Sequence, residues 1–214
     1  RAAEKHSSYL GYFFLGFAPH CHIESRFATP VHAGCVALNG RGVLLCGDSG
    51  AGKSTLSYAC ARAGWTYVSD DASSLLNDAK DRLIIGNCHQ VRFRPSAAKL
   101  FPELEGLEIT PRAAGKPSIV LPTAPMSGMV CAPTAQVDFL VFLNRRVPDP
   151  PELVPYRKDV ALYFMRQVLF GSAESLAAQY AALERLLTAE VFELRYSDLD
   201  WAVRRLGTLV REGR

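Results

Sequence analysis

A short apolar stretch runs directly into a glycine-rich loop at Gly42-Val43-Leu44-Leu45-Cys46-Gly47-Asp48-Ser49-Gly50-Ala51-Gly52-Lys53-Ser54. The apolar part predicts a fully buried strand. Residues 53–63 place their apolar side chains on one face and predict a helix directly behind the loop. The loop matches the phosphate-binding pattern G-x-x-x-x-G-K-S in the strand–loop–helix context that this pattern requires. The sequence therefore predicts a site for the phosphates of a nucleoside triphosphate.

Each residue type in this loop has a physical task. Glycines let the backbone curl so that successive N–H groups point inward, and the following helix adds the positive end of its dipole. Lys53 supplies a mobile charge for the β- and γ-phosphates, and Ser54 supplies a hydroxyl ligand for Mg²⁺. We therefore expect ATP and Mg²⁺ as cofactors. The predicted nucleotide contacts are Gly47, Asp48, Ser49, Gly50, Ala51, Gly52, Lys53, Ser54 and Thr55.

Two adjacent carboxylates, Asp70 and Asp71, follow the next predicted strand at residues 65–68. A parallel sheet places its strand ends at one edge, so we expect this pair to lie beside the phosphate loop. One carboxylate can help to hold Mg²⁺, and the other can take a proton from an attacking hydroxyl. The alternative is a solvated pair that caps the next segment, because Asp favours turns.

One histidine and three arginines are further candidates. His32 precedes the hairpin that feeds the loop strand, although a lone histidine is more often structural. Arg92 and Arg94 alternate along a predicted strand and so share a face, and Arg157 follows a proline-rich break. Each arginine could clamp phosphate oxygens or could be an ordinary surface charge.

The rest of the chain predicts an alternation of strands and helices. Asn39-Gly40 lies between apolar runs and predicts a hairpin turn, and residues 137–143 predict another strand. Residues 102–133 are rich in Pro, Gly and small residues, so we expect loops with brief strands there. Shorter strands are predicted at residues 73–76, 83–85 and 90–94, before a short helix at 95–100.

Both ends of the chain carry helical or apolar patterns. The segment Tyr12-Phe13-Phe14-Leu15 predicts a strand or a short helix packed on the main domain. In the last third, two apolar stripes of helical spacing predict helices that face the core. The stripes are formed by Leu176, Tyr180, Leu183 and Leu187, and by Leu199, Val203, Leu206 and Val210.

Charge and hydropathy exclude some classes of partner. The net charge of +3 is spread along 214 residues without a basic block, so neither nucleic acid nor a membrane surface is predicted as a partner. The pairs Arg145-Arg146 and Arg204-Arg205 are equally well explained as solvated surface. No apolar run reaches the roughly 20 residues that a membrane-spanning helix needs. The six cysteines form no CxxC pair, which favours a reducing cytoplasm.

The run from His32-Ala33 through the glycine-rich loop to Val68-Ser69-Asp70-Asp71 resembles the HPr kinase/phosphorylase catalytic domain. It is especially similar to the shorter HPr-kinase-related proteins that lack that enzyme's N-terminal domain. The resemblance is specific over residues 31–76 and more general through Arg92-Phe93-Arg94-Pro95. It implies one P-loop catalytic domain over residues 1–214. The implied α/β fold is of the phosphoenolpyruvate-carboxykinase type, with a central mixed sheet, flanking helices and a helical C-terminus.

The resemblance also implies a reaction and a set of roles. His32 would be an active-site residue, Lys53 the phosphate-binding lysine and Asp71 the general base. Ser54 would be a Mg²⁺ ligand, with Asp70 beside the metal. The implied reaction transfers the γ-phosphoryl group of ATP to a serine hydroxyl of a protein or peptide. The glycine-rich signature with a metal-binding Glu in the bifunctional members has no match here, so a reverse, phosphorylase-type reaction is not predicted.

Two alternatives stay open at this point. One is a kinase for a small metabolite. An acceptor pocket shaped by Arg92, Arg94 and the loops of residues 102–133 would favour a small anionic acceptor, whereas an open, flat approach to Asp71 would favour a protein. The other is a regulatory module that binds the nucleotide and transfers nothing. The predicted partner is thus a hydroxyl acceptor, either polypeptide or small molecule, and the sequence is compatible with a homo-oligomer.

Overall fold

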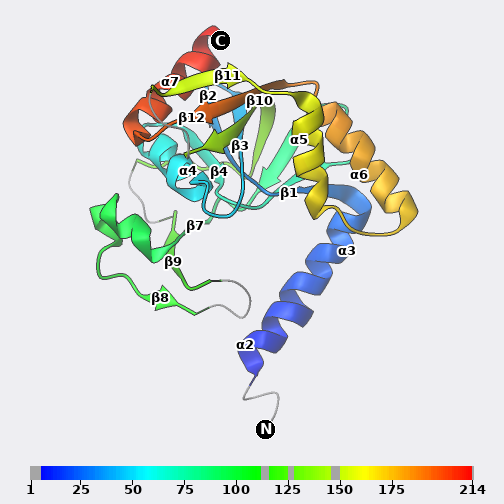
Figure 1. The fold of residues 1–214 in the computed structure, drawn as a ribbon. Helices are drawn as coiled ribbons and strands as arrows, with labels where there is room; N and C mark the ends of the chain where they lie inside the picture. The colour runs from blue at the N-terminus through cyan, green and yellow to red at the C-terminus, as the bar shows by residue number, and fades with distance from the viewer. Residues whose placement is uncertain (1–5, 112–115, 125–127, 146–149, 214) are drawn as a thin grey trace.

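The computed structural model describes residues 6–111, 116–124, 128–145 and 150–213. Within these residues a mixed sheet of nine strands forms the centre, and helices cover both of its faces (Figure 1). Seven strands lie in the order β1-β5-β6-β10-β3-β2-β4, and β12 pairs with β10 and β11. The strands of this central sheet are β1 (Ala28–Val31), β2 (Ala33–Leu38), β3 (Arg41–Cys46), β4 (Thr66–Ser69), β5 (Ser73–Leu76), β6 (Leu83–Gly86), β10 (Thr134–Asn144), β11 (Glu152–Pro155) and β12 (Glu190–Arg195).

The hairpin of β2 and β3 forms where the Asn-Gly signal predicted it. Asn39 and Gly40 both have positive φ, at 52° and 78°, as a two-residue hairpin turn requires. Beyond the turn, β3 has five consecutive buried residues and pairs in parallel with β10. This confirms the predicted buried strand, and it fixes the start of the glycine-rich loop at the end of the central strand.

Strand direction explains how the loop and the two aspartates come together. β2 runs antiparallel to both β3 and β4, so β3 and β4 run in the same direction although they are not neighbours. Their carboxyl ends therefore lie at one edge of the sheet. The predicted meeting of Asp70-Asp71 with the phosphate loop is confirmed, and an antiparallel strand lies between the two parallel ones.

Two hydrophobic cores cover the faces of the sheet. One face packs against α4 and α7, whose apolar side chains include Leu56 and Leu206. The other packs against α5 and α6, through side chains that include Met165 and Leu183. These helices are α4 (Lys53–Arg62), α5 (Lys158–Met165), α6 (Ala173–Leu186) and α7 (Leu199–Glu212). Burial of both faces explains why β3 and β10 are apolar without alternation.

A second, three-stranded sheet packs on the outer side of α4. Its strands are joined in the order β7-β9-β8, and Tyr58 of α4 packs edge-on against Phe93 and Phe101. This small sheet lies beside the glycine-rich loop and supplies one wall of the candidate site. Its elements are β7 (Gln90–Phe93), β8 (Ile109–Thr110) and β9 (Ser118–Pro122), with the short 3₁₀ helices η2 (Pro95–Lys99) and η3 (Pro102–Leu104).

The predicted packing of the N-terminal apolar segment is wrong. The chain forms one continuous helical arm, α2 (Ser7–Leu10), η1 (Gly11–Phe17) and α3 (Ala18–Phe27), that projects from the body (Figure 1). Leu15 is 83% exposed. Nowhere among the described residues does a helix combine the length and apolarity that crossing a bilayer requires.

The last third is only partly helical, which corrects the sequence interpretation. α6 and α7 lie where the two stripes predicted them, but β11 and β12 accompany them. β12 pairs in parallel with β10, and its Val191 and Leu194 are buried. Its sequence, Glu-Val-Phe-Glu-Leu-Arg, mixes charged and apolar residues over only six positions. So short a pattern between two strong helical stripes gives little signal of its own.

Candidate functional site

The glycine-rich loop joins β3 to α4 at the carboxyl edge of the sheet. Gly47, Gly50 and Gly52 have φ values of 147°, 92° and 105°, which L-residues with a side chain rarely adopt. The Leu56 amide donates to the Gly52 carbonyl at 2.8 Å, so the helix begins directly behind the last glycine. The first amides of a helix lack intrahelical partners, so they face the loop as donors for an anion.

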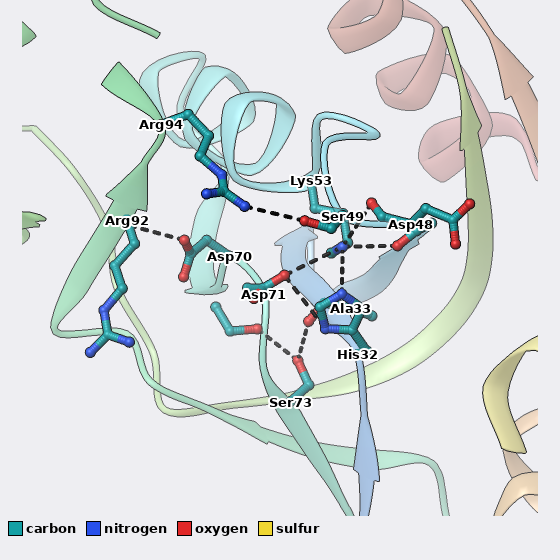
Figure 2. Close-up of polar contacts among 12 residues, drawn as sticks. His32, Ala33, Asp48, Ser49, Lys53, Asp70, Asp71, Ser73, Arg92 and Arg94 are labelled. Atoms are coloured by element: carbon teal, nitrogen blue, oxygen red, sulfur yellow. Dashed lines mark hydrogen bonds and ion pairs between the residues drawn. The ribbon is translucent and has the colours of Figure 1, made fainter. Parts of the chain in front are cut away.

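Lys53 occupies the centre of the site (Figure 2). Its side chain is only 4% exposed, and its Nζ donates to the backbone carbonyls of Gly47 at 2.8 Å and Asp48 at 3.3 Å. The same ammonium lies 3.0 Å from His32 Nε2 and 3.3 Å from Asp71 Oδ1. Lys53, His32 and Asp71, which are distant in sequence, therefore converge at the mouth of the loop as predicted.

The contacts of His32 decide its tautomer. An ammonium only donates, so His32 Nε2 must accept from Lys53 and the ring proton must sit on Nδ1. Nδ1 lies 3.6 Å from Asp71 Oδ1, too far for a hydrogen bond but close enough for electrostatic attraction. Desolvation lowers the pKa of His32, Asp71 raises it and Lys53 lowers it again. The net lowering keeps the ring neutral at pH 7.

Asp70 and Asp71 have different surroundings. Asp71 is 54% exposed and faces Lys53, whereas Asp70 is 9% exposed. Asp70 accepts from the Arg92 backbone amide at 2.9 Å and from the Ser54 hydroxyl. Burial raises the pKa of Asp70, and the hydrogen bonds from Arg92 and Ser54 partly offset that rise. One carboxylate is thus open to a reactant, and the other is held against the serine of the loop.

A short polar network fixes the strand ends that carry these residues. Ser73 Oγ donates to the Ala33 carbonyl at 2.9 Å and lies 2.7 Å from Ser69 Oγ, which ties the β1–β2 junction to the end of β4. Gly34 contributes by its lack of a side chain. A Cβ there would lie 2.5 Å from Ser57 Oγ and 3.0 Å from the Asp70 carbonyl oxygen. The approach of β2 to Asp70 therefore requires a glycine.

Two cavities flank the loop. The first, of about 400 Å³, reaches from Ser54 and Thr55 past both aspartates to the small sheet. The second, of about 450 Å³, lies on the other side against Gly47, Asp48 and Ala51. Its wall is aromatic, because it includes Phe142 and Tyr156, whose rings stack with centroids 4.8 Å apart. All nine predicted nucleotide contacts line one cavity or the other.

The sequence left each arginine open as either a phosphate clamp or an ordinary surface charge, and the structure separates these two cases. Arg92 and Arg94 line the first cavity, and Arg94 donates to Ser49 Oγ at 3.3 Å. Arg157 lines neither cavity and pairs with Asp159 in solvent, so its prediction as a phosphate clamp is not supported by the geometry. Arg145, interpreted above as surface, lies at the loop. A Cβ on Gly52 would be 3.3 Å from Arg145 Cδ.

Sequence reasoning missed Arg145 although a signal existed. Arg145 directly follows β10, which runs parallel to β3, so its position at the carboxyl edge follows from the predicted strand. Its neighbour Arg146 lies outside the described residues. Ser118 and Lys116 of the first cavity were also missed, because they belong to the region of residues 102–133 where the sequence predicted only loops with brief strands.

The contacts of His32 give a prediction with opposite signs for two substitutions. Asp71→Asn removes the attraction that raises the His32 pKa, so that pKa should fall further. Lys53→Met removes a repulsion, so the pKa should rise. NMR titration of the ring signals, assigned with His32→Gln, measures both shifts. A His32 pKa that moves in the same direction in both variants would contradict this placement of the ring.

Comparison with known proteins finds likeness among solved structures only. No protein-family model and no curated protein matches the chain. Among solved structures, the Hpr(Ser) kinase/phosphatase from Coxiella burnetii is similar over 87% of this chain and 96% of its own, with a TM-score of 0.46 and 16% sequence identity. A likeness at this level assigns neither a reaction nor a substrate to this chain.

Proposed function

We propose that this chain is an ATP-dependent kinase that transfers the γ-phosphoryl group to a hydroxyl acceptor. One observation carries the proposal: the half-exposed carboxylate of Asp71 lies 3.3 Å from the nearly buried ammonium of Lys53 at the mouth of the loop. A site that only binds phosphate gains nothing from a carboxylate beside its cation. A site that deprotonates a hydroxyl next to a phosphate needs one there.

The loop and α4 account for phosphate binding. The loop glycines and the N-terminus of α4 surround the phosphates with backbone amides, and Lys53 adds a positive charge for the β- and γ-phosphates. Arg94 and Arg145 flank the same loop. The aromatic wall of the second cavity suits the nucleoside, since stacking on an aromatic ring stabilises a base.

Asp71 and Lys53 account for the transfer. A lone pair of the acceptor oxygen forms a bond to the γ-phosphorus while the bond to the β–γ bridging oxygen breaks, and ADP leaves with that electron pair. The hydroxyl proton passes to the Asp71 carboxylate and then to solvent. Lys53 offsets the negative charge that builds on the transferring group. His32, neutral and hydrogen-bonded to Lys53, holds that ammonium toward the reaction centre.

Ser54 and Asp70 fit a magnesium ion. Both present oxygen, and a nearly buried carboxylate against a hydroxyl is a site that a hard cation stabilises. Within the described part of the chain, no three His, Cys, Asp or Glu side chains cluster as a metal cage. Mg²⁺ commonly uses one or two protein ligands with phosphates and waters, so this pair suffices. When bound, the ion would neutralise phosphate charge.

The acceptor predicted from the resemblance is a serine of a protein or peptide, and a small metabolite is the second candidate. One observation favours the small molecule. The first cavity is lined by both Asp71 and Ser118, and Ser118 is only 5% exposed. A polypeptide segment is broad, so a cavity that includes so deeply buried a residue is better suited to a slim ligand.

The proposal is tested with the purified protein, Mg²⁺ and γ-labelled ATP. We expect saturable ATP binding by calorimetry, and transfer of label to an acceptor fraction of a cell extract in the presence of Mg²⁺. Binding of ATP without transfer to any fraction would replace the kinase with the regulatory module. Absence of ATP binding would overturn the assignment of the loop.

A further inference from the structure

The first cavity is more basic than an ATP site needs. Among the described residues that line it, five are basic and two are acidic: Lys53, Arg92, Arg94, Lys116 and Arg145 against Asp70 and Asp71. A bound Mg²⁺ would add further positive charge. An excess of one sign in a cleft with low-dielectric walls raises the local concentration of the opposite charge. The charge balance leaves room for a second anion besides the triphosphate.

The five cations divide into two groups by position. Lys53, Arg94 and Arg145 contact or flank the phosphate loop itself. Arg92 and Lys116 instead belong to the small sheet and the segment that enters it. The nucleotide phosphates account for the first group. Binding of the nucleotide phosphates does not require the second group, Arg92 and Lys116.

Sheet register places Arg92 and Ser118 on one face. Arg92 pairs with Val120 across β7 and β9, and Ser118 is two residues before Val120. Side chains alternate along a strand, so Ser118 shares the face of Val120 and therefore of Arg92. The Gln90 carboxamide oxygen, in the orientation that satisfies both groups, accepts from Arg92 Nε at 2.9 Å and from a terminal guanidinium nitrogen at 2.7 Å. This contact orients the guanidinium and leaves it further N–H donors.

Ser118 is the independent sign of a ligand. It lines the cavity and is 5% exposed, and within the described residues its Oγ has no hydrogen-bond partner. A buried hydroxyl without a partner costs free energy, so a native protein seldom keeps one without a reason. The oxygen is itself buried, so rotation of the Ser118 side chain toward the cavity would be needed for a polar group of a ligand to satisfy it, on the face that carries Arg92.

We propose that Arg92, Ser118 and Lys116 form an anion subsite for the acceptor, which is a small molecule that carries both a hydroxyl and a carboxylate or phosphate group. This inference rests on the proposed kinase function and narrows its substrate. The anion binds at the small sheet, and the hydroxyl reaches Asp71. The Arg92 backbone lies beside the base, because its amide donates to the carboxylate of Asp70, the residue before Asp71. The Arg92 side chain extends away from Asp71 (Figure 2), so the acceptor must span the distance between the guanidinium and the base.

The reaction follows the proposed transfer with this acceptor in place. The acceptor hydroxyl oxygen bonds to the γ-phosphorus, the bond to the bridging oxygen breaks toward ADP, and the proton goes to Asp71. Because the acceptor's anion is held by the protein, its repulsion from the triphosphate is offset at the moment of approach. An uncharged polyol would lack that anchor and should react poorly.

The test is a panel of single acceptors with the purified chain, Mg²⁺ and γ-labelled ATP. Probes are L-serine and D-glycerate as hydroxycarboxylates, glycerol 3-phosphate as a hydroxyphosphate, uncharged glycerol, and a serine-containing peptide mixture. We expect label in a charged small molecule, and labelling of glycerol and of the peptides should be slower by at least about 100-fold. Whether a hydroxycarboxylate or the hydroxyphosphate reacts shows which anionic group the subsite binds. Label in the peptides alone would overturn the inference and keep the kinase.

Variants separate the subsite from the nucleotide site. Arg92→Gln and Ser118→Ala should each raise the KM for the charged acceptor about 10- to 100-fold, as expected for loss of a hydrogen bond to a charged group. The KM for ATP should stay within about twofold. Arg204→Gln, an exposed arginine on α7, is the matched control and should change neither value. An equal rise in the KM for ATP and for the acceptor would assign these residues to the nucleotide and overturn the inference.

Discussion

Asp71→Asn should reduce phosphoryl transfer by about 10²- to 10⁴-fold, the usual contribution of a positioned general base, while ATP binding stays nearly intact. The carboxamide keeps the size of the side chain but cannot take the acceptor's proton. The substitution should not unfold the protein, because Asp71 is 54% exposed and a solvent-screened ion pair contributes little to stability. The measurement is kcat with γ-labelled ATP, together with the Kd for ATP by calorimetry.

The control for this substitution is Asp78→Asn, an exposed aspartate that lines neither cavity and should turn over like the unmodified protein. Thermal unfolding sharpens the assignment. An unchanged melting temperature together with lost transfer would assign the effect to the missing carboxylate, whereas a general loss of structure would lower both. Normal turnover in Asp71→Asn would assign the proton transfer to another group and remove the main support for the kinase.

The strand–loop–helix unit could be predicted from the sequence because its signals are local. Positive φ at the loop glycines, the Asn39-Gly40 turn and the buried β3 are all decided by residues that are neighbours in the chain. The convergence of Asp71 on the loop was also predictable, since it needs only two strands of the same direction. The sequence did not indicate that β2 would separate them.

An acceptor pocket walled by Arg92, Arg94 and the loops of residues 102–133 was one of the alternatives that the sequence offered, but the individual residues of the anion subsite could not be predicted from local patterns. Ser118 and Lys116 lie in a region of small residues and prolines, and their position depends on the pairing of β9 with β7, which no local pattern specifies. The strand β12 was missed for a similar reason, because its burial comes from pairing with β10 rather than from its own periodicity. For Arg157 the sequence left a phosphate clamp and a surface charge open, and its exposed pairing with Asp159 agrees with the surface charge.

The site also shows why a buried lysine is tolerated at the loop. Desolvation of an ammonium is costly unless its donors are satisfied, and Lys53 donates to the carbonyls of Gly47 and Asp48 and to His32. Those partners hold the ammonium ready for the phosphates before any nucleotide arrives. His32 is therefore a positioning residue, and its neutral state lets Nε2 accept from Lys53.

Lys53→Met should lower phosphoryl transfer by about 10²- to 10³-fold or more, because it removes a preorganised positive charge from the transferring group. It should also weaken ATP binding, unlike Asp71→Asn, since the ammonium contacts phosphates in the ground state too. Without nucleotide the variant should stay folded, because an apolar side chain of similar volume replaces a buried charge.

Thermal unfolding separates these effects. Saturating ATP with Mg²⁺ at about 100 times Kd should stabilise the unmodified protein by about 2.7 kcal/mol, and Lys53→Met should lose most of that stabilisation at the same concentration. Lys80→Met, an exposed lysine outside both cavities, is the matched control and should keep it. Lys53→Arg retains the charge in a longer side chain and should recover part of the binding but little of the transfer. Unchanged ATP stabilisation in Lys53→Met would mean that the phosphates lie away from this loop.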